Sequence, residues 1–441
     1  LKEDFIWIKS YNIHYALGID GLSFALLILT CLTTLIVILA SCNSIKKNLG
    51  QYMAAFLVTQ AMMIGVFSSL DAILFYVFWE GMLIPMYLSI GIWGSGNRSY
   101  ASIKFFLYTY FGSVLMLIAL LYLGLHSGSF FINDFYKLPL SLPVQLWIFG
   151  AFALAFMVKV PMWPLHTWLP DAHTSAPAGG SVVLAALMLK LGTYGFLRFS
   201  LPIVPDACRH FATPMIILSL ISIVYISILA IQQKDMKRLV AYSSIAHMGF
   251  VILACFSIYS ILQNTQNLQY VYLALQGGMF QMLAHAISSG ALFVGIGILY
   301  DQTHTHLMHH FGGVAKKMPI FAAFFMLFCL SNIGLPGTAG FVGEFMILLS
   351  LFKANFWVLT IAASAVVFSV AYTLWMYRQV FLDEINPDIS NLHDIRWPEI
   401  TNLILLSSLI IFLGIYPHAL LQLLDSSVQH IATLSLMSKL A

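Results

Sequence analysis

The chain has 441 residues, of which 60% are hydrophobic and only 8% are charged, and its formal net charge is +3. Because soluble domains carry about 25% charged residues, this composition excludes an ordinary soluble domain and indicates an integral membrane protein. The small net charge and the scattered positions of the basic residues also exclude nucleic acid as a partner.

Twelve apolar segments of membrane-spanning length follow one another along the chain. A helix needs about 20 residues to cross a bilayer, and short stretches rich in Gly, Pro, Asn and Asp separate the segments. The loops between them are too short to contain a soluble domain. The expected spans lie near residues 16–41, 52–70, 71–93, 103–125, 145–160, 181–198, 214–232, 239–259, 270–300, 319–350, 356–381 and 400–416.

Lysine and arginine gather in the loops on one side of the expected membrane. The loops after the odd-numbered spans contain eleven of these residues, and the loops after the even-numbered spans contain four. By the positive-inside rule, we expect the side with eleven to face the cytoplasm or the mitochondrial matrix. Both ends of the chain are then expected on the opposite side.

Six ionisable residues lie inside the expected spans, where hydrocarbon should surround them. A buried charge is costly unless it is paired, neutralised or hydrated. Each residue alone has an ordinary explanation, such as a structural ion pair or a hydrogen-bonded core histidine. Six such groups on six spans, without a redox ligand among them, favour a chain of proton-exchanging sites. They are Glu80, Lys159, Lys190, His247, His285 and Glu344.

The cysteines and the loop histidines do not indicate a metal site. The five cysteines lie far apart, without the C-x-x-C spacing of a metal or iron–sulfur site. A histidine cluster in one loop lacks cysteine or carboxylate support beyond Asp301, so no metal is expected there either. The clustered residues are His304, His306, His309 and His310. Ordinary helix caps explain the polar residues at segment ends, namely Asp71, Asp171 and His173.

Two of the expected spans contain a proline break next to a deep ionisable residue. Pro161 and Pro164 lack the N–H groups that would continue the first of these helices, so it should end just after Lys159. The sequence Gly-Leu-Pro-Gly at 334–337 interrupts the tenth span shortly before Glu344. Broken helices at membrane depth are tolerated only where they line a cavity or pack inside protein.

The two breaks predict an inverted repeat. Spans two to six and seven to eleven form two five-helix halves, and the broken helix is the fourth of each half. An odd number of spans gives the halves opposite orientations, as in inverted-repeat transporters. The predicted fold is therefore an all-α polytopic membrane protein. Its parts are 1–51 (N-terminal segment and first span), 52–198 (first repeat), 199–381 (second repeat) and 382–441 (last span and C-terminal tail).

Three long motifs resemble a known family. They are V-K-V-P-M-W-P-L-H-T-W-L-P-D-A-H-T-S-A-P-A-G-G-S at 158–181, D-M-K-R-L-V-A-Y-S-S-I-A-H-M-G-F at 235–250 and L-P-G-T-A-G-F-V-G-E-F at 335–345. Together they resemble the signature of the proton-translocating, antiporter-like membrane subunits of respiratory NADH:quinone oxidoreductase (complex I). The resemblance covers essentially the whole chain. Glu344 stands where subunit M, the counterpart of mitochondrial chain 4, has a glutamate and the related subunits have a lysine.

The resemblance implies a role for each of the six deep residues. Glu80 and Lys159 would form a coupled acid–base pair, and Lys190 would be a connecting lysine. His247 and His285 would form a central relay that ends at Glu344, the exit-side acid. The family also implies fourteen spans; since the chain opens on Leu1, we expect the first two to be missing.

The same resemblance implies where the redox chemistry takes place. NAD, FMN, iron–sulfur clusters and quinone are expected in partner subunits, with no cofactor in this chain. The partners would be the other membrane subunits of the complex, which would also accept the segment from His418 onward. The expected location is the bacterial cytoplasmic membrane or the mitochondrial inner membrane.

The function predicted from the sequence is proton transfer along a hydrated path near the middle of the membrane. Weakening of the Glu80–Lys159 pair would release a proton toward Lys190, and quinone reduction in another subunit would supply the energy. Two alternatives remain open. A stand-alone cation/proton antiporter would be favoured by a lysine at position 344, and a non-transporting scaffold would tolerate apolar residues at all six positions.

Overall fold

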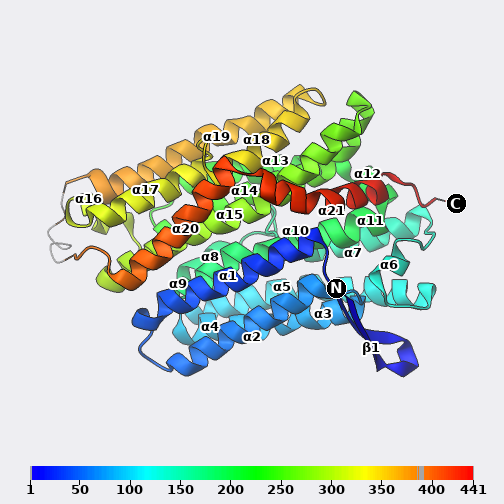
Figure 1. The fold of residues 1–441 in the computed structure, drawn as a ribbon, viewed down its shortest axis with the longest axis horizontal. Coiled ribbons are helices and arrows are strands. Elements are labelled where there is room, and N and C mark those ends of the chain that lie inside the picture. The colour runs from blue at the N-terminus through cyan, green and yellow to red at the C-terminus, as the bar shows by residue number, and fades with distance from the viewer. Residues whose placement is uncertain (1, 385, 387–391, 441) are drawn as a thin grey trace.

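Long helices that lie side by side make up nearly the whole chain (Figure 1). The computed structural model describes residues 2–384, 386 and 392–440. Within these residues, eleven helices are long and apolar enough to cross a membrane. The expected tenth span is divided into two shorter apolar helices. Eleven of the twelve spans predicted from the sequence are thus confirmed as single long helices or helical segments, and the second helix break is confirmed in the tenth.

The helices that form the bundle follow the expected order. They are α1 (Gly21–Ser44), α2 (Leu49–Ser68), α3 (Ala72–Gly81), α4 (Leu83–Trp93), α5 (Arg98–Ser127), α7 (Leu142–Lys159), α8 (Trp168–Ser175), α9 (Ala178–Val183), α10 (Leu189–Gly195), α13 (Ala212–Ile231), α14 (Met236–Thr265), α15 (Leu268–Thr303), α17 (Pro319–Ile333), α18 (Ala339–Leu351), α19 (Phe356–Tyr377) and α20 (Trp397–Ile415).

Short elements connect and extend the bundle. The short α-helices are α6 (Ile132–Phe135), α11 (Leu201–Ile203), α12 (Pro205–His210) and α16 (Val314–Lys317), and a longer one, α21 (His418–Leu436), follows the last span. Three π-helical turns are η2 (Leu184–Met188), η3 (Phe196–Ser200) and η5 (Arg378–Leu382). Two 3₁₀ turns are η1 (Lys9–Tyr11) and η4 (Met308–His310).

The centre of the bundle is formed by the helices that are apolar on every side. The segment 178–203, α14 and α15 are almost entirely buried among other helices. The outer helices, such as α19 and α20, bury less than a third of their span. A helix that is apolar all round belongs in a protein core or in lipid. Here His247, His285 and Lys190 lie on the helices that occupy the core.

A β-hairpin precedes the first span, and the sequence did not predict it. Strands β1 (Lys2–Ile8) and β2 (Ile13–Gly18) pair antiparallel. The first span therefore begins at Gly21 and not at residue 16. Asp20 defines this start, because its side chain accepts a hydrogen bond from the Ser23 N–H at 2.9 Å and caps the helix.

The C-terminal tail is a helix that packs on this chain itself. Helix α21 follows Pro417 and lies against α1 and α15 (Figure 1). The Ser427 hydroxyl accepts from the Leu22 N–H at 3.3 Å, and Gln276 of α15 donates to Asp425 at 3.1 Å. We expected neighbouring subunits to accept this segment, but its buried face is covered by its own bundle.

Candidate functional site: a buried relay between two helix breaks

The first helix break occurs where the prolines predict it. Helix α7 ends at Lys159. The carbonyl of Met157, which Pro161 cannot serve, accepts from the Met162 N–H at 2.9 Å. The indole N–H of Trp168 donates to the carbonyl of Val158 at 2.8 Å. Because other donors satisfy these freed carbonyls, the break is a stable part of the fold.

Lys159 is buried beside an aromatic ring. Its side chain is 1% exposed, and its Nζ lies 5.2 Å from the centroid of the Trp79 ring. Among the residues that the structure describes, neither Lys159 Nζ nor Glu80 Oε1 has a hydrogen-bonding partner. The two groups are electrostatic neighbours but do not form a salt bridge. The predicted acid–base pair of Glu80 and Lys159 is therefore close in space but makes no direct hydrogen bond.

Lys190 is held by an irregular turn of its own helix. The π-turn η2 shifts the backbone bonding, so that the Leu189 N–H donates to the carbonyl of Leu184. The carbonyl of Ala185 is then available, and Lys190 Nζ donates to it at 2.6 Å. π-Turns often mark functional positions in helices. Here the turn provides an acceptor for a lysine that is fully buried.

Two close contacts and a pair of neighbouring histidine rings lead from Lys190 to Glu344. Lys190 Nζ lies 2.7 Å from Nδ1 of His285, and the rings of His285 and His247 are 5.6 Å apart between centroids. His247 Nδ1 lies 2.6 Å from Oε1 of Glu344. All four residues are at most 7% exposed. Four of the six predicted residues are thus brought together in one buried row.

A glutamine that the sequence analysis missed completes the end of this row. Gln281 donates to the same Glu344 oxygen as His247, at 2.9 Å. Gln281 precedes His285 by four residues on α15, so the two residues share one face of the helix. This spacing was the signal available in the sequence. Because a glutamine side chain is uncharged, nothing in the sequence marks Gln281 as part of the relay before its contact with Glu344 is known.

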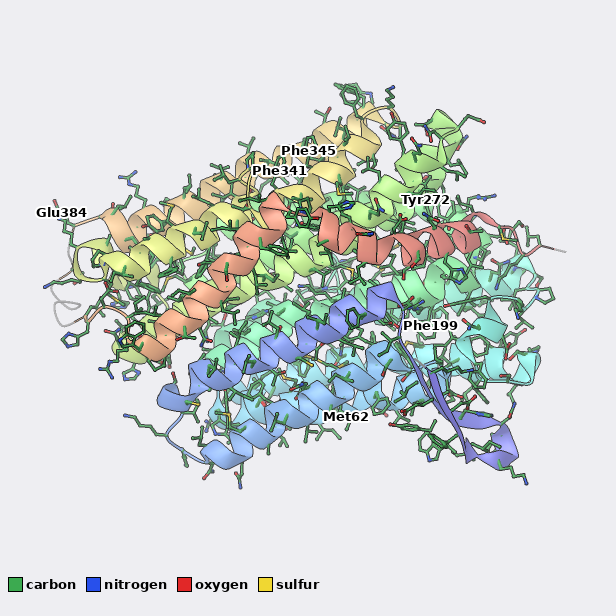
Figure 2. The ribbon with its side chains drawn as sticks, in the orientation of Figure 1. Met62, Phe199, Tyr272, Phe341, Phe345 and Glu384 are labelled. Carbon is green, nitrogen blue, oxygen red and sulfur yellow. The ribbon has the colours of Figure 1, made fainter. Side chains whose placement is uncertain are left out.

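The second break places Glu344 between the core and the outer surface. Helix α17 ends with Gly334 at φ +83°, a conformation that suits glycine, and the Leu335 N–H returns to the carbonyl of Leu330 at 3.0 Å. The next residue after Glu344, Phe345, is 48% exposed and stacks on Phe341 at the outer side of α18 (Figure 2). Glu344 itself points inward and is 7% exposed.

The residues interpreted as caps have different roles. Asp71 does cap α3, because its Oδ1 accepts from the N–H groups of Ile73 and Leu74. Asp171 instead joins α5 and α14 through ion pairs with Lys104 at 2.7 Å and Arg238 at 3.3 Å. His173 is completely buried. Its interpretation as an ordinary cap is not supported, because neither ring nitrogen has a hydrogen-bonding partner in the part of the chain described.

Two unpartnered polar atoms lie in this buried row, and a third belongs to Lys159. Among the described residues, these atoms are His247 Nε2, His285 Nε2 and Lys159 Nζ. A buried polar atom without a partner costs about 1–3 kcal/mol, and buried water commonly satisfies such atoms. The arrangement therefore suits a hydrated path for protons. Over the described residues, no group of three or more His, Cys, Asp or Glu side chains is arranged to hold a metal ion.

Comparison with known proteins places this arrangement in a family. The model of the NADH:quinone oxidoreductase/Mrp antiporter transmembrane family matches residues 69–369. A second model, of the amino terminus of NADH-ubiquinone oxidoreductase chain 4, matches residues 5–68. The first match contains all three motifs from which the resemblance was inferred.

Individual relatives agree with the family models. NADH-quinone oxidoreductase subunit M of Rhodobacter capsulatus is 45% identical over 97% of this chain and 84% of its own. NADH-ubiquinone oxidoreductase chain 4 of Marchantia polymorpha is 41% identical over 97% of this chain and 85% of its own.

A solved structure has the same fold. A chain of respiratory complex I from Thermus thermophilus with bound NADH superposes with a TM-score of 0.90 and 30% identity, over 98% of this chain and 89% of that one. With the eleven long apolar helices, these matches identify an integral protein of the bacterial or mitochondrial inner membrane. The chain belongs to the antiporter-like family of NADH:quinone oxidoreductase membrane subunits.

Proposed function

We propose that this chain is a proton-translocating membrane subunit of NADH:quinone oxidoreductase and that it moves protons through its buried row of lysine, histidine and glutamate. The observation that carries the proposal is the row Lys190–His285–His247–Glu344, whose direct contacts measure 2.7 Å at one end and 2.6 Å at the other. Its relatives bear the names of subunit M and chain 4 of this enzyme.

Each group in the row suits the transfer of a proton. Histidine gains and loses a proton near neutral pH and has two ring nitrogens, so it can accept on one and release from the other. His285 faces Lys190 through Nδ1, and His247 faces Glu344 through Nδ1. The Nε2 atom of each ring has no partner among the residues described. The two free nitrogens belong to rings 5.6 Å apart, a gap that suits a bridging water.

Lys159 and Glu80 are proposed as the responsive end of the path. Because Lys159 Nζ and Glu80 Oε1 have no hydrogen-bonding partner in the described part of the chain, a small movement of Glu80 changes how well it stabilises the Lys159 ammonium. A weaker interaction releases the lysine proton toward Lys190, and a stronger one recaptures it. Quinone reduction in another subunit would drive this change. The electron-carrying NAD, FMN, iron–sulfur clusters and quinone are proposed to reside in partner subunits.

The proposal is tested by the variant Glu344→Gln. Glutamine keeps the size and hydrogen-bonding capacity of the side chain but cannot exchange a proton. We expect normal assembly, with loss of proton translocation and of the coupled quinone reductase rate. The measurement is dye quenching in membrane vesicles during NADH oxidation, normalised to the amount of complex. Pumping at the wild-type rate would assign Glu344 to a structural role and favour the scaffold alternative.

The proteins that co-purify with this chain distinguish the proposed function from the stand-alone antiporter alternative. If the chain acts within the enzyme, NADH dehydrogenase activity co-purifies with it in mild detergent. If it acts alone, the purified chain exchanges a cation for protons in vesicles without NADH. The glutamate at 344, where related chains have lysine, agrees with the first outcome.

A further inference from the structure

A cavity lined mainly by polar residues opens at the end of the bundle that carries most of the loop lysines and arginines. Its volume is about 330 Å³. It lies where α5 begins, where α8 ends and where α14 begins. Its polar lining comes from Ser95, Asn97, Asp171, Thr174, Ser175, Arg238 and His306. By the positive-inside rule this end faces the cytoplasm or the matrix.

His306 lines this cavity and contacts the bundle interior. It is 8% exposed, neither ring nitrogen has a hydrogen-bonding partner among the described residues, and its ring stacks on Tyr300 at 4.2 Å. The backbone fixes it, since its carbonyl accepts from the Met236 N–H at 3.0 Å. Burial and the charge of Lys237 hold the pKa of the His306 imidazole down to about 3, so the ring is neutral at rest.

Lys237 is a third buried lysine. The sequence analysis placed it in a loop, but its side chain is only 2% exposed. Its Nζ donates to the carbonyl of Ala176 at 2.7 Å and lies 5.7 Å from the centroid of the Tyr300 ring. Tyr300 therefore contacts His306 and also lies beside this ammonium. As with the other two lysines, stability alone does not explain a charge at this depth.

His173 occupies the space between this lysine and the central row. Its ring stacks on Phe293 of α15 at 4.5 Å with an interplanar angle of 3°. Its two charged neighbours are Lys237 and Lys190, and His285 is within electrostatic reach of it. The free ring nitrogens of His173 and His306 are the kind of buried atoms that ordered water satisfies.

The spacing along α15 shows that these groups form successive levels. His285, Phe293 and Tyr300 are eight and seven residues apart. At 1.5 Å per residue, the levels marked by His285, by the His173 stack and by the Lys237 contact are each separated by about 10–12 Å. One ionisable group stands at each level from the cavity to the row. A few water molecules suffice to bridge each interval.

We propose that His306, Lys237 and His173 form an uptake branch that delivers protons from the cytoplasmic or matrix side to the Lys190–His285 pair. This inference rests on the proposed function of the central row. Lys237 passes its ammonium proton through water to His173, and His173 releases a proton from its other ring nitrogen to the neutral amine of Lys190. The neutral amine of Lys237 then takes the proton from one nitrogen of His306, while the other nitrogen of His306 binds a proton from water in the cavity. Lys237 is again an ammonium, and both histidines are again neutral.

Lys237→Arg is the main test. Arginine keeps the positive charge and the donor to the Ala176 carbonyl but does not release its proton in proteins. If Lys237 is only structural, pumping stays near wild type. As a relay group, its replacement lowers proton translocation per complex by about tenfold or more. Lys234→Arg is the matched control, since Lys234 lies three residues before Lys237, just ahead of α14, and is exposed.

A second variant keeps the test decisive if the larger arginine disturbs assembly. His173→Phe preserves the ring that stacks on Phe293 but has no exchangeable proton. We expect the same loss of pumping, with a normal amount of complex and a normal rate of NADH oxidation by a soluble acceptor that bypasses quinone. Wild-type pumping in an assembled His173→Phe enzyme would overturn the uptake branch.

Glu344→Gln, measured in the same vesicles, separates this inference from the proposed function. If Glu344→Gln is inactive while Lys237→Arg and His173→Phe pump normally, the central row stands and the uptake branch is wrong. If Glu344→Gln itself pumps normally, the proposed function fails. A rate limited by proton uptake should also show a larger slowing in D₂O in the Lys237→Arg enzyme than in wild type. A structural defect would not change that ratio.

Discussion

The two broken helices hold their ionisable residues in opposite ways. At the α7–α8 break, Lys159 lies over the ring of Trp79. Neither its Nζ nor Oε1 of nearby Glu80 has a hydrogen-bonding partner within residues 2–384, 386 and 392–440. At the α17–α18 break, Glu344 accepts from both His247 and Gln281. The first site is loosely held and the second is firmly held.

This difference suggests a division of labour. A buried charge without a partner is costly, so its protonation depends strongly on small changes around it. A carboxylate that accepts hydrogen bonds from two donors is held in a fixed position. The first break is thus suited to respond to events in partner subunits, and the second to conduct protons through a fixed path. The predictions below test this contrast, beginning with the largest expected effect.

Glu80→Ala should remove the response at the first break and abolish pumping. Glu80 is the only deep acid near Lys159 and Lys190 in that half of the sequence, so no other carboxylate can stabilise the charged lysine. We expect quinone-linked proton pumping at background level with the assembled complex still detectable. The measurement is dye quenching together with NADH oxidation in membrane vesicles.

Glu80→Asp is the matched variant for this prediction. Aspartate restores the charge on a shorter side chain, so its effect should be milder if the lost charge is the cause. Normal pumping and normal coupled NADH oxidation in Glu80→Ala membranes would refute the coupling of Glu80 to Lys159.

Gln281→Leu should loosen the firm site without removing it. The variant deletes one of two donors to Glu344 and leaves His247 in place. A hydrogen bond to a charged group contributes about 1.5–3 kcal/mol, so we expect pumping to fall by about tenfold, less than with Glu80→Ala.

Gln276→Leu controls for the loss of a glutamine on the same helix, because Gln276 bonds Asp425 of α21 away from the row. Vesicle pumping normalised to complex content is again the readout. Equal rates for the two glutamine variants would show that Gln281 does not position Glu344.

Trp79→Phe should give the smallest effect. The indole face lies 5.2 Å from Lys159 Nζ, and phenylalanine offers a weaker but similar aromatic face. Because a cation–π contact is worth about 0.5–2 kcal/mol and part of it remains, the expected loss is about twofold. Trp79→Leu removes the aromatic face and should lose more.

The two Trp79 variants are compared through the pH dependence of the pumping rate, which reports on the proton held by Lys159. If both variants have the wild-type pH profile, Trp79 only fills space beside Lys159.

Two kinds of feature were predictable from the sequence: charges whose burial in hydrocarbon is energetically unfavourable, and helix breaks caused by the missing N–H of proline. Lys159, Lys190 and Glu344 stand out because charges are expensive in hydrocarbon, and both breaks follow from proline. The end of α7 at Lys159 and the division of the tenth span are confirmed. The positions of the deep groups along the chain could be read directly, although the division into two five-helix halves and the roles of the six residues stay predictions.

Features that depend on spatial partners were not predictable in this way. Gln281 is neutral, so nothing marks it before Glu344 is found beside it. Lys237 lies only two residues after Asp235 in a polar segment, and hydropathy cannot tell that its side chain turns inward. The hairpin before α1 was missed because its strands expose aromatic residues that resemble the start of a span.

The π-turn at Leu184–Met188 changes the direction in which the side chains after it point around the helix axis. Each residue of an α-helix advances the side chains by about 100° around the axis. The turn accommodates an extra residue, so Lys190 is rotated relative to the part of the helix before Leu184. Removing one residue from this turn would leave the hydropathy of the span almost unchanged. It would nevertheless swing Lys190 away from His285, so the direction in which the lysine points is encoded in residue count and not in residue type.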